Sequence, residues 1–294
     1  MEDLVLNNLI KKNLSNLDIN KSSSDLSDLT IIIPTYNRQN FLIRQIIYLS
    51  NYNVNLLIAD GSEKKIDQKI INKLKNYKDF NYIHSDNLSY VDRIKFASKK
   101  IQSKYAMCLA EDDFLVFSGV EKAIKELKND PSLSACFGQI AALDYNKFKK
   151  KSFLIDYGAS LQNYSIRHSN PIDRLNFAFE SYRSFSPYAV FNQNQFKEIW
   201  SKIDHSFCLE LTEYEHAINT LLTGEIKIIN ELFWIRSQEL EALDNKVDGS
   251  RKNNFKKWYT EKNFELDVKK FEERTLKNLS HYLGYSKKES LIVL

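Results

Sequence analysis

Short apolar runs alternate with amphipathic segments over the first half of this sequence, and that alternation constrains the fold more than any other feature. Apolar residues recur in the intervening segments at helical spacing, whereas the runs themselves are typical of buried strands. Strands joined through helices form a mainly parallel, doubly wound sheet. We therefore predict an α/β fold with helices on both faces of a Rossmann-like sheet, whose strands are 30–34, 55–59, 80–84, 105–109 and 133–143.

Changes in composition along the chain indicate its domain organisation. Residues 1–28 are polar and predict a flexible or helical leader. The main domain is expected over residues 29–243, in two halves, 29–145 and 146–243. A Lys-rich, aromatic stretch then predicts a helical C-terminal extension over residues 244–294.

Helix-capping patterns set several of the expected boundaries. Capping boxes begin at Ser89, Ser118 and Thr212. Asn170 is followed by proline, the order expected for an N-cap and a first helical residue. A short helix is also expected over residues 195–203. Further strands are expected over 186–191, 226–229 and 232–235.

The composition excludes several classes of protein. The 294 residues include only 7 glycines, and neither common Gly-rich phosphate-binding motif occurs. A net charge of +4 does not indicate a nucleic-acid partner. No apolar run reaches the roughly 18 residues that a transmembrane helix needs, and the N-terminus lacks the features of a secretory signal. Three widely spaced cysteines without a C-x-x-C pair indicate buried thiols in a reducing compartment. We therefore expect a cytoplasmic protein.

Three consecutive acids, Glu111, Asp112 and Asp113, follow the strand predicted over residues 105–109. Adjacent carboxylates at the end of a buried strand repel one another, and loss of water strengthens that repulsion. A divalent cation would relieve it, and oxygen ligands suit Mg²⁺ and Mn²⁺. The alternative is a solvated acidic turn without a ligand.

Polar residues from two other predicted strands point to the same edge of the sheet. Tyr36 and Arg38 follow the first strand, and Asp60 ends the second. In open α/β sheets, ligands bind outside the carboxyl ends of the strands. These residues and the acidic turn therefore indicate one ligand site.

Three motifs, in this order, resemble a known family. T-I-I-I-P-T-Y-N-R, L-I-A-D-G-S and L-A-E-D-D-F are similar to motifs in the nucleotide-sugar-binding half of family 2 glycosyltransferases, which have the GT-A fold. The resemblance is close over residues 29–145 and weaker as far as about residue 236. It implies a nucleotide-sugar donor. The residues that would contact its nucleoside are Pro34, Thr35, Tyr36, Arg38 and Asp60, the last of them at the base or ribose.

The resemblance also implies a metal and a diphosphate site. Asp112 matches a metal-binding aspartate of the family and Asp113 lies beside it, so Mn²⁺ or Mg²⁺ would be held there. Glu111 occupies a position that varies in the family. Arg93 or Lys95, on the helix that follows Ser89, would reach the base or the diphosphate.

Members of the family carry an acidic pair at the start of a helix that ends in glycine. Counting back from Gly224 places the catalytic acid at Glu213, with Glu215 in reserve. The resemblance implies that Glu213 takes the proton from an acceptor hydroxyl on a glycan, a lipid-linked glycan or a protein, in an inverting transfer. The alternative is an acid that only interacts with the helix dipole. Arg236 is a candidate phosphate clamp or the member of a surface ion pair.

Two positions depart from the family pattern, because Ala59 and Ala110 stand where aspartates are usual. They motivate an alternative function, a catalytically inactive nucleotide- or sugar-binding module on the same fold. A sugar-nucleotide nucleotidyltransferase has a related sheet, but the Gly-rich loop with Arg and Lys that it needs after the first strand is absent.

Two further groups of residues have more than one expected role. Basic and aromatic residues mix in the stretches 147–151 and 251–258, which predicts contact with an anionic membrane surface or, alternatively, a solvated face. Aromatic rings suit stacking against an acceptor sugar, with core packing as the alternative. The candidates for such stacking, with one arginine among them, are Tyr182, Arg183, Phe185 and Tyr188.

Overall fold

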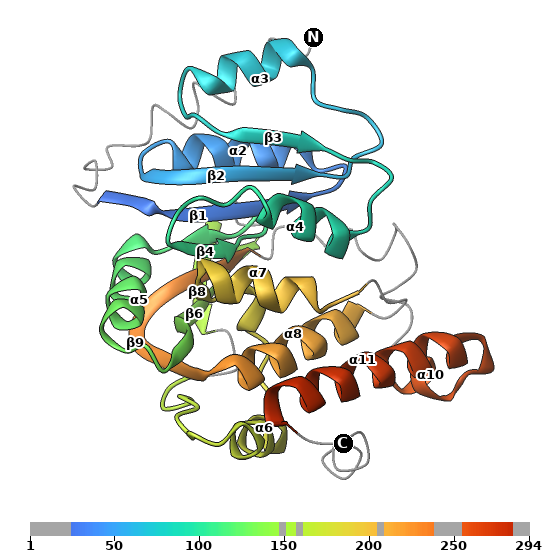
Figure 1. Cartoon of the computed structure of the whole chain (residues 1–294). Helices are drawn as coiled ribbons and strands as arrows, with labels where there is room; N and C mark the ends of the chain where they lie inside the picture. The colour runs from blue at the N-terminus through green and yellow to red at the C-terminus, as the bar shows by residue number, and fades with distance from the viewer. Residues whose placement is uncertain (1–24, 147–150, 157–160, 205–208, 238–254, 285–294) are drawn as a thin grey trace. The chain divides into compact units, whose positions relative to one another are not determined.

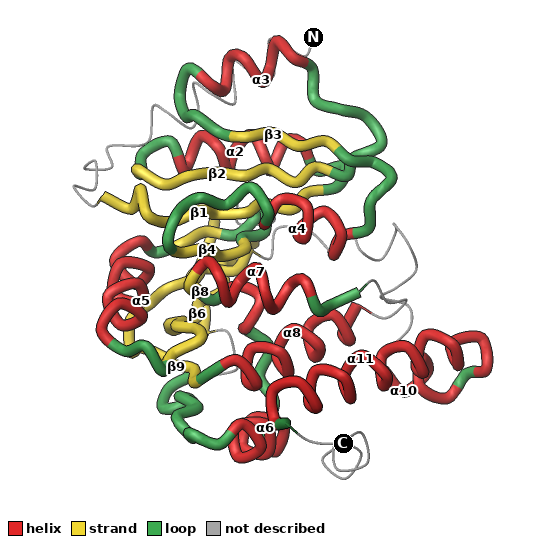
Figure 2. Tube along the Cα trace, in the orientation of Figure 1, coloured by secondary structure: helices red, strands yellow, loops and turns green. Residues whose placement is uncertain are grey.

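The computed structural model describes residues 25–146, 151–156, 161–204, 209–237 and 255–284 (Figure 1). The chain divides into two compact units, Met1–Phe114 and Leu115–Leu294. Strands form the centre of each unit and helices pack around them, as the tube in Figure 2 shows. Within the described ranges, no helix combines the length and the apolar character that a bilayer crossing requires.

A parallel sheet in the order β3-β2-β1-β4 forms the first unit. Ile31, Ile32 and Ile33 of β1 have no exposed surface, because both faces of this strand are covered. The parallel arrangement predicted for this part of the chain is therefore confirmed. The strands are β1 (Asp25–Thr35), β2 (Asn53–Asp60), β3 (Asn81–His84) and β4 (Tyr105–Cys108).

The helices of the first unit are α2 (Gln39–Leu49), α3 (Gln68–Lys75) and α4 (Tyr90–Ser98). The chain runs outward from β1 through β2 to β3, and then returns to β4 on the other side of β1. Right-handed crossovers therefore place α2 and α4 on opposite faces of the sheet (Figure 1). The strand order reverses between β1 and β4, and ligands of such sheets bind outside the carboxyl ends of the strands at that point.

A mixed set of strands forms the second unit. β6 (Leu133–Asn146) pairs in parallel with β9 (Glu225–Ser237), and antiparallel with β7 (Lys151–Asp156) and β8 (Val190–Asn192). The short β5 (Phe114–Leu115) is the neighbour of β9. Together the two units confirm the predicted class, an α/β fold with a mainly parallel sheet.

Helices cover the strands of the second unit. A 3₁₀ turn, η1 (Ser186–Tyr188), precedes β8, and a second one, η3 (Lys262–Phe264), separates the last two helices. Figure 1 shows α11 running beside α8, and the two helices are in contact. The helices are α5 (Phe117–Asn129), α6 (Pro171–Glu180), α7 (Gln193–Ser201), α8 (Leu209–Thr223), α10 (Phe255–Thr260) and α11 (Glu265–Leu283).

Trp258 attaches the C-terminal helices to α8. Its side chain is 1% exposed and packs with Leu211, and its indole N–H donates a hydrogen bond to Asp267 at 2.7 Å. An indole that is buried and hydrogen-bonded in this way is not available to a membrane surface. The other stretch predicted to touch a membrane, 147–151, lies outside the described residues apart from Lys151, the first residue of β7.

Two predicted N-caps are confirmed. The hydroxyl of Ser89 accepts a hydrogen bond from the backbone N–H of Asp92 at 3.1 Å, and the side chain of Asn170 accepts one from the N–H of Ile172 at 2.8 Å. The other two are wrong. Ser118 lies inside α5, which begins at Phe117, and Thr212 lies inside α8. Both helices therefore begin before the residue that the local capping pattern indicates.

Three predictions about strands also need correction. Residues 186–188 form η1, and only 190–192 are a strand, so the run predicted over 186–191 is a turn followed by β8. The two strands expected at 226–229 and 232–235 are one strand, β9, whose register with β6 shifts near Phe137 and Gln139. β7 was not among the predicted strands.

The predicted domain boundaries at residues 28, 145 and 243 stay predictions. β1 begins at Asp25, inside the stretch expected to be a leader, and residues 1–24 lie outside the described ranges. Residues 244–254 of the expected C-terminal extension also lie outside them, and α10 and α11 follow. Cys108 and Cys136 are buried free thiols, as expected, whereas Cys208 is not among the described residues.

Candidate functional site

Hydrogen bonds tie the loop after β1 to the loop after β2. The backbone N–H of Asn37 donates to the hydroxyl of Ser62 at 2.8 Å, and the N–H of Glu63 donates to the side-chain oxygen of Asn37 at 3.1 Å. The N–H of Gly61 donates to the carbonyl of Thr35 at 3.0 Å. Asn37 has a φ of 52°, a left-handed conformation that asparagine adopts more readily than most residues. The two loops therefore form one frame at the carboxyl edge of the sheet.

Asp60, at the end of β2, is fully buried, and its own chain supplies its hydrogen bonds. One carboxylate oxygen accepts from the N–H and the hydroxyl of Ser62, at 2.8 and 2.5 Å, and the other accepts from the hydroxyl of Tyr82 at 2.5 Å. Burial, together with the Asp60 carboxylate, raises the pKa of Tyr82, so this phenol stays protonated and remains a donor. A direct contact of Asp60 with a base or ribose would require one of these donors to move, and that role stays a prediction.

Arg93 of α4 is a buried cation in the same unit. Its side chain fills the space beside Gly61, where an added Cβ would lie 1.0 Å from Nη1, and its Cζ lies 6.0 Å from the ring centroid of Tyr36. The residue is 7% exposed, and in the described part of the chain its Nε has no hydrogen-bond partner. Burial lowers the pKa of Arg93, although an arginine remains cationic at neutral pH. A buried guanidinium of this kind fits an anionic ligand.

The other residues predicted for the donor lie around Arg93 and the loop frame. The hydroxyl of Thr35 is buried and has no hydrogen-bond partner among the described residues. Pro34 pairs in register with Ala59. Tyr36 donates from its hydroxyl to Glu63 at 3.3 Å. Lys95 lies further along α4, where its Nζ is 3.9 Å from Asp92.

The acidic turn after β4 is paired with an arginine. Arg38 directs Nη2 to Oδ2 of Asp112 at 2.5 Å and Nη1 to Oε1 of Glu111 at 3.3 Å. Arg44 donates from Nη2 to the backbone carbonyl of Asp112 at 3.1 Å. Asp113, which is 4% exposed, closes the turn with its N–H directed to the carbonyl of Ala110 at 3.3 Å. The solvated turn considered from the sequence is therefore not what forms, because Glu111 and Asp112 pair with Arg38 and Asp113 is buried.

The metal predicted at this turn would have to bind carboxylates that already contact Arg38. Carboxylates are the right ligand type for Mg²⁺ or Mn²⁺, but Asp112 already has a guanidinium on one oxygen. Among the described residues, no group of three or more His, Cys, Asp or Glu side chains is arranged to hold a metal ion. As arranged, Asp112 and Asp113 thus do not fit a metal, and the metal stays a prediction.

Glu213 lies on α8 in the second unit. The hydroxyl of Ser184 donates to its Oε2 at 2.6 Å, and the hydroxyl of Tyr182 donates to its backbone carbonyl at 3.4 Å. The helix dipole acts mainly on charges in the first turn. α8 begins at Leu209, so Glu213 lies beyond that turn. Its place therefore favours a role other than interaction with the dipole.

Glu215, the reserve candidate, is held in a buried ion pair. Its carboxylate, 1% exposed, accepts from Nε and Nη2 of Arg274 on α11, at 2.8 and 3.2 Å. One turn further along, Asn278 donates to the side chain of Asn219 at 3.0 Å. A carboxylate that is engaged on both oxygens and closed to solvent is a poor proton acceptor for a substrate, so the geometry favours Glu213.

The remaining candidates are divided between surface and core. Arg236 lies on β9, opposite Ala142 in β6, and is partly exposed. Phe185 is 3% exposed and stacks on Phe137 with ring centroids 5.5 Å apart, so it belongs to the core. Tyr188 stacks on Trp234 at 4.5 Å, and Tyr182 stacks on Phe179 at 5.4 Å. Arg183 lies over the ring of Tyr164, with its Cζ 4.7 Å from the centroid.

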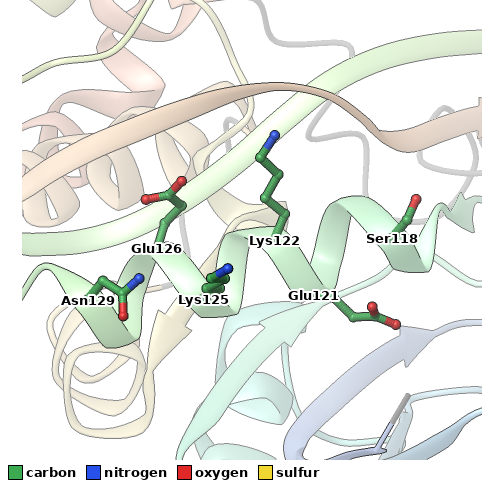
Figure 3. Close-up of a pocket in the computed structure, with 6 residues that line it drawn as sticks. All are labelled: Ser118, Glu121, Lys122, Lys125, Glu126 and Asn129. Carbon is green, nitrogen blue, oxygen red and sulfur yellow. The ribbon is translucent and has the colours of Figure 1, made fainter. Parts of the chain in front are cut away.

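A groove along α5 contains none of these residues (Figure 3). Two of its charged side chains pair with residues of β9: Lys122 with Glu231 at 2.7 Å, and Glu126 with Lys227 at 2.8 Å. Paired charges on a helix surface do not indicate a ligand site. The residues that line the groove are Ser118, Glu121, Lys122, Lys125, Glu126 and Asn129.

Comparison with models of protein families identifies the family of this chain. The model of the family "Glycosyl transferase family 2" matches residues 30–200, more than half of the chain. This chain belongs to glycosyl transferase family 2. The match begins at β1 and includes the loop frame, Arg93 and the acidic turn. No curated protein matches the chain.

Solved structures similar to this family 2 chain include the glycosyltransferase TarS of S. aureus. TarS 1–349 superposes with a TM-score of 0.57 at 11% sequence identity, over 90% of this chain and 69% of that one. The complex of TarS 1–349 with UDP gives a TM-score of 0.53 over the same shares. The complex with UDP-GlcNAc gives 0.55, also at 11% identity, over 88% of this chain and 74% of that one. The fold is therefore that of the GT-A glycosyltransferases, as the resemblance implied.

Sequence reasoning missed several residues of the family 2 site. Ser62 and Tyr82 supply the donors that hold Asp60, and Arg44 holds the backbone of Asp112. Ser62 stood within a quoted motif and could have been found there. Tyr82 and Arg44 carry no local signal, because their partners lie 22 and 68 residues away in the sequence.

Proposed function

We propose that this protein transfers a sugar from a nucleotide-sugar donor to an acceptor hydroxyl on a glycan, a lipid-linked glycan or a protein. The observation that carries the proposal is Arg93, a buried guanidinium beside Gly61 and Tyr36 whose Nε lacks a partner in the described part of the chain. The diphosphate of a nucleotide sugar would give this guanidinium an anionic hydrogen-bond partner at Nε. The hydroxyl of Thr35 is a second polar group for which the described residues provide no partner.

The donor proposed is a uridine diphosphate sugar. TarS structures with UDP and with UDP-GlcNAc are among the similar folds, which supports this nucleotide as the first to test. Tyr36 and the loop frame around Asn37 would hold the nucleoside, and Arg93 would hold the diphosphate. Arg236 and Lys95 are further candidates for phosphate contact, since each is a partly buried cation.

Glu213 is the proposed general base. The hydrogen bond from Ser184 fixes one carboxylate oxygen of Glu213. The carboxylate is thereby held in one orientation, and its other oxygen would accept the proton. Glu213 would take the proton from the acceptor hydroxyl as that oxygen attacks the anomeric carbon, and the bond from that carbon to the diphosphate would break. A single displacement of this kind inverts the configuration at the anomeric carbon. Assistance by Mn²⁺ or Mg²⁺ stays a separate prediction.

Calorimetry with UDP, UDP-sugars and GDP-sugars tests the donor. We expect a UDP-sugar to bind, and Arg93→Gln to weaken that binding about 10- to 100-fold, because hydrogen bonds to charged groups contribute about 1.5–3 kcal/mol. Arg167→Gln is the matched control, since Arg167 is an exposed arginine of the second unit that pairs with Asp130 and Glu225. The proposal fails if no nucleotide sugar binds the unaltered chain, or if both variants bind alike.

The inactive binding module remains the second candidate, and the ion pair of Arg38 with Asp112 favours it. Such a module would bind the donor in calorimetry but would release no sugar or UDP from it. Detection of UDP released over hours, with and without Mn²⁺, separates the two functions.

A further inference from the structure

Three aromatic rings gather where the end of α6 lies against the first half of α8. The ring of Phe179 stacks on that of Tyr182, with centroids 5.4 Å apart and planes 6° from parallel. The ring of Tyr214 contacts both, with its centroid 6.3 Å from that of Phe179 and 4.8 Å from that of Tyr182. Aromatic rings at these separations attract one another. We call these three residues the aromatic platform.

Phe179 is the exposed member of the aromatic platform. It is 39% exposed, whereas Tyr182 and Tyr214 are partly buried. A parallel neighbour covers one face of a ring, so solvent reaches Phe179 from the other face. A single exposed apolar residue is ordinary on a protein surface, but this one is held in place by two other rings. Its open face is a six-membered ring, which matches the face of one pyranose sugar.

Contacts beneath the aromatic platform fix it before any ligand binds. The hydroxyl of Tyr182 donates to the backbone carbonyl of Glu213 at 3.4 Å. Burial raises the pKa of Tyr182, so the phenol stays neutral and remains a donor. Tyr214 packs against the cluster of Leu211 and Trp258. The platform is therefore joined to α8 and to the packed interior of the second unit.

Polar side chains border the aromatic platform. Ser184, which is exposed, directs its hydroxyl to Oε2 of Glu213 at 2.6 Å, and it lies two residues after Tyr182. Asn176 is exposed and lies one turn before Phe179, on the same face of α6. A sugar ring has apolar C–H groups on its faces and hydroxyls around its edge. An aromatic face beside hydroxyl, amide and carboxylate groups therefore suits a sugar.

The same surroundings disfavour other kinds of ligand. A lipid tail would bury little of its apolar surface on one open ring. An anionic ligand would meet the carboxylates of Glu180, which is exposed, and of Glu213. The cation of this stretch, Arg183, lies over the ring of Tyr164, with its Cζ 4.7 Å from the centroid. A neutral glycan is thus the ligand that these groups favour.

We propose that Phe179 is the stacking platform for a neutral sugar residue of the acceptor, which makes the acceptor a free or lipid-linked glycan rather than a protein. The binding of a neutral sugar stands on the geometry of the platform alone. The role of that sugar as the acceptor rests on the proposed function, in which Glu213 takes a proton from the acceptor hydroxyl. The stretch from Tyr182 to Ser184 would then hold both the glycan and the carboxylate of Glu213.

Saturation-transfer NMR with neutral trisaccharides tests the platform. The probes are chitotriose, maltotriose and cellotriose, each titrated into the unaltered protein and its variants. We expect at least one of them to bind, and Phe179→Ala to weaken that binding about three- to tenfold, because the aromatic face is lost. Phe179→Trp keeps such a face and should bind within about threefold of the unaltered protein.

Tyr77→Ala is the matched control, because it removes a ring of the first unit that is 41% exposed. It should change the affinity for the trisaccharide less than about twofold. Circular dichroism checks that each variant is folded. The platform is overturned if none of the three trisaccharides binds the unaltered protein, if Phe179→Ala binds as well as the unaltered protein, or if Tyr77→Ala loses as much affinity as Phe179→Ala.

The outcomes separate this proposal from the proposed function. If a trisaccharide binds through Phe179 but no UDP-sugar binds, the proposed function fails and the sugar platform stands. If sugar transfer is measured, Phe179→Ala should raise the KM for the acceptor glycan about three- to tenfold and leave kcat within about threefold. A fall in kcat without a rise in KM, or transfer to serine and threonine hydroxyls of a peptide but to no glycan, would overturn the assignment of the acceptor.

Discussion

Removal of Arg274 should destabilise the second unit strongly, because it strands a buried carboxylate. The side chain of Glu215 is 1% exposed and that of Arg274 is 18% exposed, and hydrogen bonds of 2.8 and 3.2 Å join them. Removing one partner of a buried pair costs about 3–5 kcal/mol. The second acid near Arg274, Asp204, is 3.9 Å away and exposed, so it adds less than about 1 kcal/mol. We expect Arg274→Met to lower the free energy of unfolding by about 4 kcal/mol.

Urea denaturation followed by tryptophan fluorescence measures this loss. All tryptophans of the sequence, Trp200, Trp234 and Trp258, belong to the second unit, so their fluorescence reports on that unit alone. With an m value of about 2 kcal/mol per molar urea, the expected loss lowers the midpoint by about 2 M.

Two further variants show whether the buried charge is the cause. Arg167→Met removes an arginine whose side chain is 41% exposed and should cost less than about 1 kcal/mol. Glu215→Gln combined with Arg274→Met leaves no charge behind and should be more stable than Arg274→Met alone. The reasoning is refuted if Arg274→Met costs no more than Arg167→Met, or if the double variant is the less stable one.

Three other predictions concern single side chains. Burial lowers the pKa of His216 from 6.5 to about 3, so as the pH falls the unfolded chain takes up this proton before the folded chain does. The contribution of neutral His216 to the stability of the second unit is therefore fully present above pH 6.5. Below pH 6.5 the free energy of unfolding falls by up to about 1.4 kcal/mol per pH unit. Urea titrations at about pH 7, 6 and 5 measure this slope, and an equal slope in His216→Gln would exclude His216 as its source. Gly61→Ala would place a Cβ 1.0 Å from Nη1 of Arg93, so the guanidinium must move. The affinity for a UDP-sugar should then fall about tenfold or more, with little change in thermal stability. An unchanged affinity in calorimetry would show that Arg93 does not bind the donor. Glu213→Gln should lower the rate of sugar transfer about 10²- to 10⁴-fold while UDP affinity stays within about threefold, and Ser184→Ala should lower the rate less; a fully active Glu213→Gln enzyme would remove Glu213 from the mechanism.

The sequence is sufficient to predict the first unit where local pattern and packing agree. The apolar run from Thr30 to Ile33 is buried on both faces in β1, and Ser89 caps α4 through the predicted hydrogen bond. In the second unit the same capping pattern is misleading, since Thr212 lies inside α8. In that helix Leu211 packs against Trp258, a residue that lies far away in the sequence. Local rules fail where distant contacts outweigh them.

The candidate site shows the same limit. The motifs placed Tyr36, Arg38, Asp60 and the acidic turn at one edge of the sheet, and in the structure their loops follow β1, β2 and β4 as expected. The sequence could not show that Arg38 and Asp112, which are 74 positions apart, form an ion pair. Motif order predicts that residues converge, but the rotamers that decide which charge meets which carboxylate depend on the packed structure.

The hydrogen bonds around Asp60 have a consequence for changing donor preference. Through Ser62 and Tyr82 this one carboxylate links the loop after β2 to β3, and Ser62 in turn holds Asn37 in the loop after β1. An insertion or deletion in any of these segments would disturb all three, so their lengths are poor targets for engineering. Tyr36 projects from one of the linked loops, and replacing it would remove its exposed hydrogen bond to Glu63 and leave those of Asp60, Ser62 and Asn37 in place, so libraries for new donors should be directed there.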